Sequence, residues 1–173
     1  MITQSQQVGS QTVLAGVNQS VIDLTLNHPC KYFMVLYRTQ TNTTNKEYFN
    51  FSGGETGEYA GEAFNRMSLT LNNNERLERW PPIYYRIWQP LMVWKRKPDK
   101  HIYVYSFALY PTDENPSGSL NFSRIDNAKL RLEYSAPLAD QAEIQISSNI
   151  YRQDHLNTDR RRLLNIEINS LEG

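Results

Sequence analysis

Short stretches in which apolar and polar residues alternate, separated by turn residues, constrain the fold of this 173-residue chain more than any other feature. A period of two is that of a β-strand with one buried face. The clearest stretches are residues 21–26, 32–38, 64–71, 102–109, 128–134 and 143–151. No long segment has a helical period, and no internal repeat or linker divides the chain. The pattern predicts a single domain over residues 1–173, an all-β sandwich or barrel of about eight short strands.

Three regions depart from this alternation. Residues 1–19 are polar and are expected to form an extended N-terminal arm or a weak strand with a loose end. Residues 39–62 form a long polar loop, which in a compact domain is usually functional. Residues 153–173 form a divergent C-terminal tail, for which both a final strand and a short helix remain open.

The segment 101–127 is the most distinctive part of the chain. A predicted strand is followed by Pro111, Asn115, Pro116, Ser117 and Gly118, which indicates a tight, ordered loop. We expect Gly118 to hold a backbone angle that is costly for other residues, and Pro116 to stiffen the loop.

Two charged residues follow this loop two positions apart. In a strand, Arg124 and Asp126 would share a face, where a charge-assisted pair could fix the loop to the next strand. Two independently solvated charges are an equal alternative.

No catalytic or metal-binding pattern stands out. His28, His101 and His155 are far apart and match no metal-ligand spacing. Cys30 is the only cysteine, so no internal disulfide forms, and we interpret it as a buried thiol rather than a nucleophile.

Nor do the glycines and acidic residues of the 39–62 loop form a recognisable site. Residues 53–57 contain three glycines but lack the Lys-Ser/Thr pair of a phosphate loop. Glu55, Glu58 and Glu62 have no evident partners. We therefore predict that the chain is not an enzyme and needs no cofactor or metal.

Charge and hydropathy exclude further classes. Eighteen basic and eighteen acidic residues cancel, which argues against general nucleic-acid contact and permits self-association. Basic clusters at 95–97 with Lys100, and at 160–162, are interpreted as a solvated rim or subunit contact. With Trp94 and Tyr103 interleaved, the first could instead meet a phosphate backbone or an acidic neighbour. No apolar run of about eighteen residues exists, so membrane insertion is not expected.

Aromatic residues are dense between positions 80 and 94. Ile83 to Trp88 is expected to form one or two helical turns that end at Pro90. We expect this cluster to form core and a subunit interface, with a sugar-stacking platform as the alternative. The candidate interface residues are Trp80, Tyr84, Tyr85, Trp88 and Trp94.

Four blocks of sequence closely resemble those of the major capsid proteins of nucleocytoplasmic large DNA viruses. They are Leu26–Lys31 with Asn27-His28-Pro29, the Tyr48–Ser52 loop, the Leu69–Arg79 strand pair, and the segment 102–127. The last block is the most specific. Its signature residues are Tyr103, Tyr105, Phe107, Pro116, Ser117, Gly118, Asn121, Phe122, Ser123, Arg124, Asp126 and Asn127.

This resemblance implies a jelly-roll β-sandwich of two packed antiparallel sheets and a structural role. Such a protein would pair with copies of itself and with other capsid proteins, in trimeric capsomers of an icosahedral virion shell assembled in the host cytoplasm. The family's full-length protein carries two jelly rolls, whereas this chain has the length of one. A lectin-like jelly roll on a virion surface is the alternative.

Overall fold

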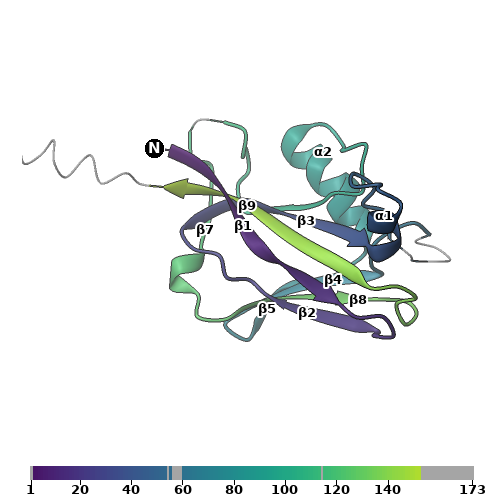
Figure 1. Cartoon of the computed structure of the whole chain (residues 1–173). Helices are drawn as coiled ribbons and strands as arrows, with labels where there is room; N and C mark the ends of the chain where they lie inside the picture. The colour runs from purple at the N-terminus through teal and green to yellow at the C-terminus, as the bar shows by residue number, and fades with distance from the viewer. Residues whose placement is uncertain (1, 54, 56–59, 114, 153–173) are drawn as a thin grey trace, which may run out of the picture.

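The alternating stretches form two β-sheets that pack face to face (Figure 1). The structure is a computed structural model, and it describes residues 2–53, 55, 60–113 and 115–152. The strands of these residues are β1 (Ile2–Val13), β2 (Gln19–Asp23), β3 (Pro29–Thr39), β4 (Arg66–Leu71), β5 (Asn74–Trp80), β6 (Tyr103–Ser106), β7 (Leu120–Asn121), β8 (Ala128–Glu133) and β9 (Ala142–Arg152). Helical segments are α1 (Gln40–Thr44), η2 (Tyr84–Trp88), α2 (Gln89–Trp94) and η3 (Phe122–Arg124).

The strand order is that of a jelly roll. One sheet has the order β1-β9-β3-β6, with the two-residue β7 also paired to β3, and the other has the order β2-β8-β4-β5. All pairs are antiparallel. The chain passes repeatedly from one sheet to the other, so neighbours in space are distant in sequence. The predicted all-β jelly-roll sandwich is confirmed.

The core is the apolar layer between the sheets. Alternate residues of β3 point inward, so Phe33, Val35 and Tyr37 are buried while Tyr32 and Met34 are only half-buried. In the opposing sheet β8 alternates in the same way, whereas three consecutive residues of β4, Met67 to Leu69, are buried. The fully buried side chains of this sheet include Met67, Leu69, Leu130 and Leu132.

Residues 2–13 form a full edge strand. β1 pairs with β9 from Ile2 to Val13, with a register shift between Val8 and Gln11. Of the two predicted alternatives, an extended arm or a weak strand, the structure has the strand for residues 2–13. The sequence signal is weak because, among the β1 side chains that the structure describes, Val8 and Val13 alone reach the core. The predicted tail, 153–173, lies outside the described residues.

The predicted strand 102–109 is shorter in the structure, where β6 ends at Ser106. The amides of Phe107 and Ala108 both donate to the carbonyl of Lys31, at 2.8 and 3.2 Å. Consecutive amides of a strand point in opposite directions, so two bonds to one carbonyl require a bend. The apolar alternation continues past the bend, which is why the sequence alone overestimates the strand.

Pro90 does not end the helix as expected. The wide turn η2 spans Tyr84–Trp88, and α2 continues from it with Pro90 in its first turn. The Gln89 amide donates to the Tyr84 carbonyl, five residues back. A proline ring would clash with the carbonyl four residues before it in a regular helix, and the wider turn relieves that clash.

A two-residue turn joins β4 and β5. Asn72 and Asn73 have φ of 48° and 65°, and they lie between the paired residues Leu71 and Asn74. This confirms the expected left-handed turn. The Asn72 side-chain oxygen also accepts the amides of Asp126 and Asn127, both at 3.1 Å. One asparagine thus ties this hairpin to the segment before β8.

We predict that Asn72→Ala destabilises the fold more than Asn73→Ala. Both variants lose the tolerance of asparagine for left-handed backbone, but only Asn72→Ala removes the acceptor of two amides. The difference in the free energy of unfolding should be about 1 kcal/mol, measured by urea denaturation. Equal losses of unfolding free energy in the two variants would show that the hydrogen bonds of the Asn72 side chain do not contribute to stability.

Candidate assembly surface

Two signature blocks that are far apart in sequence meet in the structure. The His28 amide donates to Ser123 Oγ (2.9 Å), and the Phe122 amide donates to the His28 carbonyl (3.2 Å). Pro29 pairs with Asn121 where β3 meets β7, and Asn121 Oδ1 accepts the Ser123 amide (3.0 Å). His28 has a φ of 69°, which sharply reverses the chain before β3. Asn27 is exposed, and its amide donates to Gln6 Oε1 (3.3 Å).

The loop around Gly118 packs against the bend after β6. Ser117 Oγ accepts the Tyr110 amide (2.8 Å), and Gly118 has a φ of +142°. A Cβ at Gly118 would lie 2.8 Å from the Phe107 carbonyl oxygen. The expectation that Gly118 holds a backbone angle costly to other residues is confirmed. Pro116 is exposed, and its predicted stiffening role stays a prediction.

The aromatic signature residues form a packed group beneath this loop. The ring of Phe107 lies 5.9 Å from Phe33, 5.2 Å from Tyr105 and 5.9 Å from Phe122, centroid to centroid. Such tilted and edge-on pairs add to the stabilisation from burial alone. The signature residues therefore shape backbone and core rather than line a cleft.

Arg124 and Asp126 are both exposed, and they form no ion pair with each other in the described part of the chain. Arg124 lies in η3, not in a strand, so the shared strand face proposed for the two residues does not exist. Asp126 is held through its backbone amide by Asn72 instead. The solvated-charge interpretation is the correct one.

A buried carboxylate holds the helical segment on the sandwich. Glu62 is buried, pairs with Arg86 of η2 (2.5 Å, Oε1 to Nη2) and accepts the Tyr103 hydroxyl (2.9 Å). Tyr103 also accepts the Ala63 amide (2.7 Å), and burial together with the Glu62 carboxylate keeps the pKa of Tyr103 well above its ordinary range. Sequence analysis did not predict this group, because Glu62 and Tyr103 lie 41 positions apart in the chain.

The expectation that these loop carboxylates lack partners is therefore wrong for two of them. Glu62 has the contacts above, and the buried Glu55 accepts the amide and hydroxyl of Ser135. Glu58 lies outside the described residues. Both carboxylates hold a loop in place through these bonds, as structural groups do.

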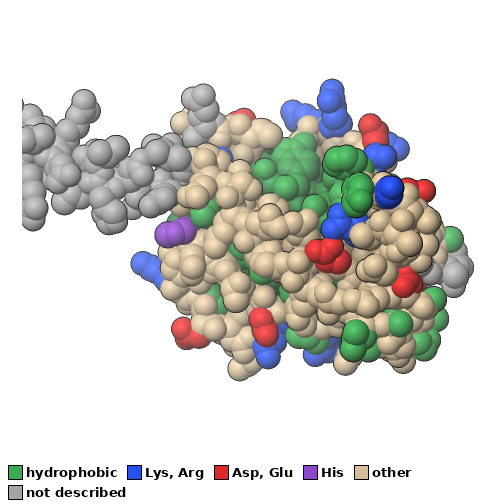
Figure 2. Space-filling view, in the orientation of Figure 1, with side chains coloured by type: hydrophobic (Ala, Val, Ile, Leu, Met, Phe, Trp, Pro, Cys, Tyr) green, Lys and Arg blue, Asp and Glu red, His purple; other side chains and the backbone are tan. Residues whose placement is uncertain are grey.

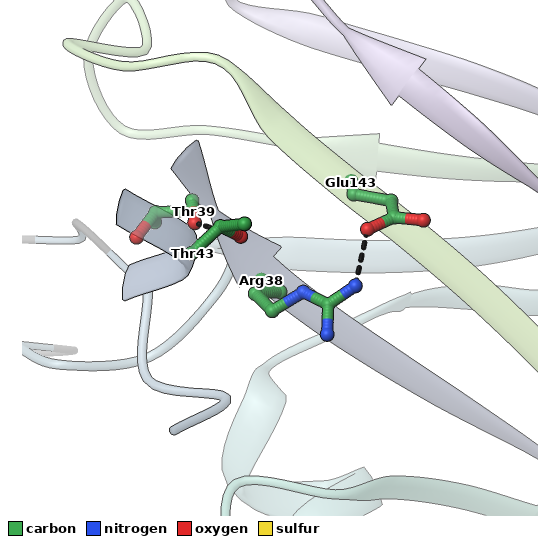
Figure 3. Close-up of polar contacts among 4 residues, drawn as sticks. All are labelled: Arg38, Thr39, Thr43 and Glu143. Carbon is green, nitrogen blue, oxygen red and sulfur yellow. Dashed lines mark hydrogen bonds and ion pairs between the residues drawn. The ribbon is translucent and has the colours of Figure 1, made fainter. Parts of the chain in front are cut away.

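The 39–62 loop begins at a capped helix. Thr39 Oγ1 accepts the Asn42 amide at the start of α1, and Thr43 Oγ1 donates to the Thr39 carbonyl (3.3 Å). Beside it, Arg38 of β3 pairs with Glu143 of β9 at 2.5 Å, as Figure 3 shows. The Arg38 hydrogen bond is the main reason that the pKa of Glu143 is lowered. The loop is thus anchored where it leaves the sheet.

The predicted interface aromatics divide into three groups. Tyr85 is fully buried and donates to the Met67 carbonyl (3.0 Å), so it belongs to the core and not to an exposed interface. Trp94 is half-buried, edge-on to Tyr32 at 5.2 Å. Trp80 and Trp88 are exposed, with Trp80 stacked on the half-buried Tyr84. They do not make one continuous sugar platform.

Reactive chemistry is not evident in the described residues. They contain no group of three or more His, Cys, Asp and Glu residues that could hold a metal. Cys30 is buried, as predicted, and burial raises the pKa of its thiol to about 12. His28 is exposed, while burial and then the Arg86 guanidinium lower the pKa of His101. His155 lies outside the described residues.

The basic cluster at 95–97 with Lys100 is fully on the surface, but Tyr103 is buried. The expected interleaving of this tyrosine with the cations is therefore wrong. The second cluster, 160–162, lies outside the described residues. Across the described ranges, no helix has the length and apolar character needed to cross a membrane.

The fold and its contacts define a jelly-roll protein whose signature residues fix loops and pack in the core. Comparison with known proteins specifies it further. The family described as "Large eukaryotic DNA virus major capsid protein" matches residues 1–170. The chain belongs to this family, which confirms the resemblance found in the sequence and the prediction of a structural, non-enzymatic protein.

Comparisons with individual relatives point to the same family. The chain is 48% identical over 67 residues to the major capsid protein of Phaeocystis pouchetii virus, covering 39% of this chain and 13% of that protein. It is 30% identical over 162 residues to the major capsid protein of Paramecium bursaria Chlorella virus 1, covering 78% of this chain and 36% of that protein. A solved structure, the quasi-atomic model of the PBCV-1 virus capsid, superposes on this chain with a TM-score of 0.64 at 23% identity. The match covers 85% of this chain and 47% of that chain. The chain thus spans less than half the length of these relatives.

We predict that Gly118→Ala lowers the free energy of unfolding by about 1–3 kcal/mol, because a Cβ there meets the Phe107 carbonyl and the backbone angle disfavours L-residues. Gly9→Ala is the matched control, since its Cβ would have no neighbour within 4 Å. Thermal unfolding measures both. Equal stability of the two variants would remove the structural role of Gly118.

We also predict that native Cys30 resists alkylation at pH 8. With a pKa raised to about 12, the thiol stays protonated, and the nucleophilic thiolate is absent. Iodoacetamide labelling followed by mass spectrometry should modify the urea-unfolded chain readily and the folded chain hardly at all. Comparable labelling rates in both states would contradict this environment.

Proposed function

We propose that this chain is a structural subunit of the virion capsid of a large DNA virus. It would assemble through jelly-roll contacts into trimeric capsomers of an icosahedral shell, with copies of itself and other capsid proteins as partners. Assembly would take place in the host cytoplasm. The observation that carries the proposal is the family match over residues 1–170 on a chain that folds as a jelly roll.

The arrangement of the signature residues supports this role. They hold the loops on the sandwich through bonds to backbone atoms, as at His28 and Asn72. A shell subunit needs loops of fixed shape, because its neighbours must fit them without large ordering costs. The 39–62 and 110–118 loops would shape the outer surface of the capsomer.

The lectin-like alternative has less support. A sugar platform needs exposed aromatic faces side by side, whereas Tyr85 is buried and Trp94 packs on Tyr32. Trp80 lines a shallow hollow of about 420 Å³ with the charged side chains of Arg66, Glu75, Glu78 and Arg79. The other exposed tryptophan, Trp88, does not line this hollow, so the two rings do not form one platform. We therefore retain the lectin activity only as an outcome of the test below.

We predict that the purified chain forms trimers or larger closed oligomers. Size-exclusion chromatography with light scattering should give a mass of at least three chains, unchanged by added glycans. A mass of one chain at every concentration would contradict the proposal. Binding to a glycan array that is lost in Trp80→Ala and Trp88→Ala would favour the lectin alternative.

A further inference from the structure

One side of the helix η2–α2 leaves apolar side chains in water. Trp88, Leu91 and Met92 are spaced by three and four residues, which puts them on one helical face. They are 60%, 42% and 66% exposed, whereas Gln89 and Pro90 on the other side are buried. Figure 2 shows hydrophobic side chains gathered where α2 lies in Figure 1. Exposed tryptophan and methionine are typical of interface centres.

Cations adjoin this apolar face. Lys95, Arg96 and Lys97 follow α2 directly and are exposed, as is Lys100. Three of them, with Trp94 and Pro98, line a shallow hollow of about 530 Å³. None of the four forms an ion pair with another described residue. We call this combination of Trp88, Leu91, Met92 and the four cations the basic face.

The charge of the chain favours a second copy as the occupant of the basic face. The 95–100 segment has four cations and one acid, Asp99, so it carries a net charge of +3. Because the whole chain is neutral, the remaining residues carry −3. Two basic faces opposed to each other would repel, so the basic face of one copy needs a surface of opposite charge on the other copy.

A complementary surface lies on the turn after β6. Leu109 and Tyr110 are 72% and 57% exposed, and Asp113 is also exposed. Among the described residues between positions 101 and 123, Asp113 is the one exposed acidic or basic side chain, and the Lys31 ammonium that reaches this turn is buried, so the exposed charge of the turn is negative. Its backbone is fixed, because Ser117 Oγ accepts the Tyr110 amide and Lys31 Nζ donates to the Pro111 carbonyl (3.3 Å). We call Leu109, Tyr110 and Asp113 the acidic turn.

We propose that the basic face of one copy binds the acidic turn of the next copy, in a head-to-tail contact between subunits. This inference rests on the proposed function, since it specifies which surfaces mediate the assembly proposed above. Apolar side chains from both surfaces would be buried at the centre, and the charges would lie at the rim and fix the orientation.

Charge reversal tests the contact. Lys95→Glu/Lys97→Glu and Asp113→Lys should each raise the dissociation constant of the oligomer by about tenfold or more, and combining them should restore part of the lost affinity. Lys46→Glu/Lys129→Glu is the matched control, because it reverses two exposed cations elsewhere and should leave assembly unchanged. Sedimentation velocity measures assembly, and thermal unfolding confirms that each variant is folded.

The outcomes are distinguishable. A wild-type oligomer that none of the reversals weakens would overturn this inference and leave the proposed function intact. A wild-type chain that stays monomeric would overturn both. If the control weakened the oligomer as strongly as the basic-face variant does, the effect would come from net charge alone and the inference would be overturned. The inference would also be overturned if Lys95 and Lys97 bound anionic vesicles or DNA and their reversal had no effect on assembly.

Discussion

Burial of one apolar layer between two sheets is the interaction on which the rest of this structure depends. Most connections between consecutive strands cross from one sheet to the other, with β4–β5 and β6–β7 as the connections within one sheet, so the two sheets form together. Phe33, Val35 and Tyr37 of β3 pack against residues contributed by β4 and β8. Each such fully buried side chain contributes roughly 1.5–3 kcal/mol, which offsets the entropy cost of ordering long-range neighbours. Loops and helices are attached to this two-layer block and take their positions from it.

The attachments are made largely through backbone atoms. His28 and Ser123 join β3 to the segment before β8, Asn72 joins the β4–β5 hairpin to the same segment, and Gly118 allows a close approach to the Phe107 carbonyl. Bonds of this kind define loop shape without creating a reactive site. This explains how a family signature can be specific and yet belong to a structural, non-enzymatic protein.

The helical segment η2–α2 shows how the interior determines the surface. The ion pair between Glu62 and Arg86 and the hydroxyl of Tyr103 hold the segment on the sandwich, while Trp88 and Met92 remain in water. The buried Glu62 carboxylate has two partners, which offsets the cost of removing its charge from water, and Arg86 is partly exposed. The internal group thereby positions the exposed residues that we assign to subunit contact.

By itself, the sequence determined the fold class, the strands β3, β4, β8 and β9 and the Asn72–Asn73 turn, because period-two alternation and left-handed turn residues are local signals. It also carried the family signature and the buried state of Cys30. Only the tertiary structure decided that β6 ends at Ser106, that Pro90 continues a helix, that Tyr85 is core and that Glu62 is paired. The β6 bend, the burial of Tyr85 and the pairing of Glu62 depend on partners far away in the sequence, such as the Lys31 carbonyl at the bend, and local pattern contains no information about them. The helix continues through Pro90 because of the wide turn before it, which apolar alternation does not reveal.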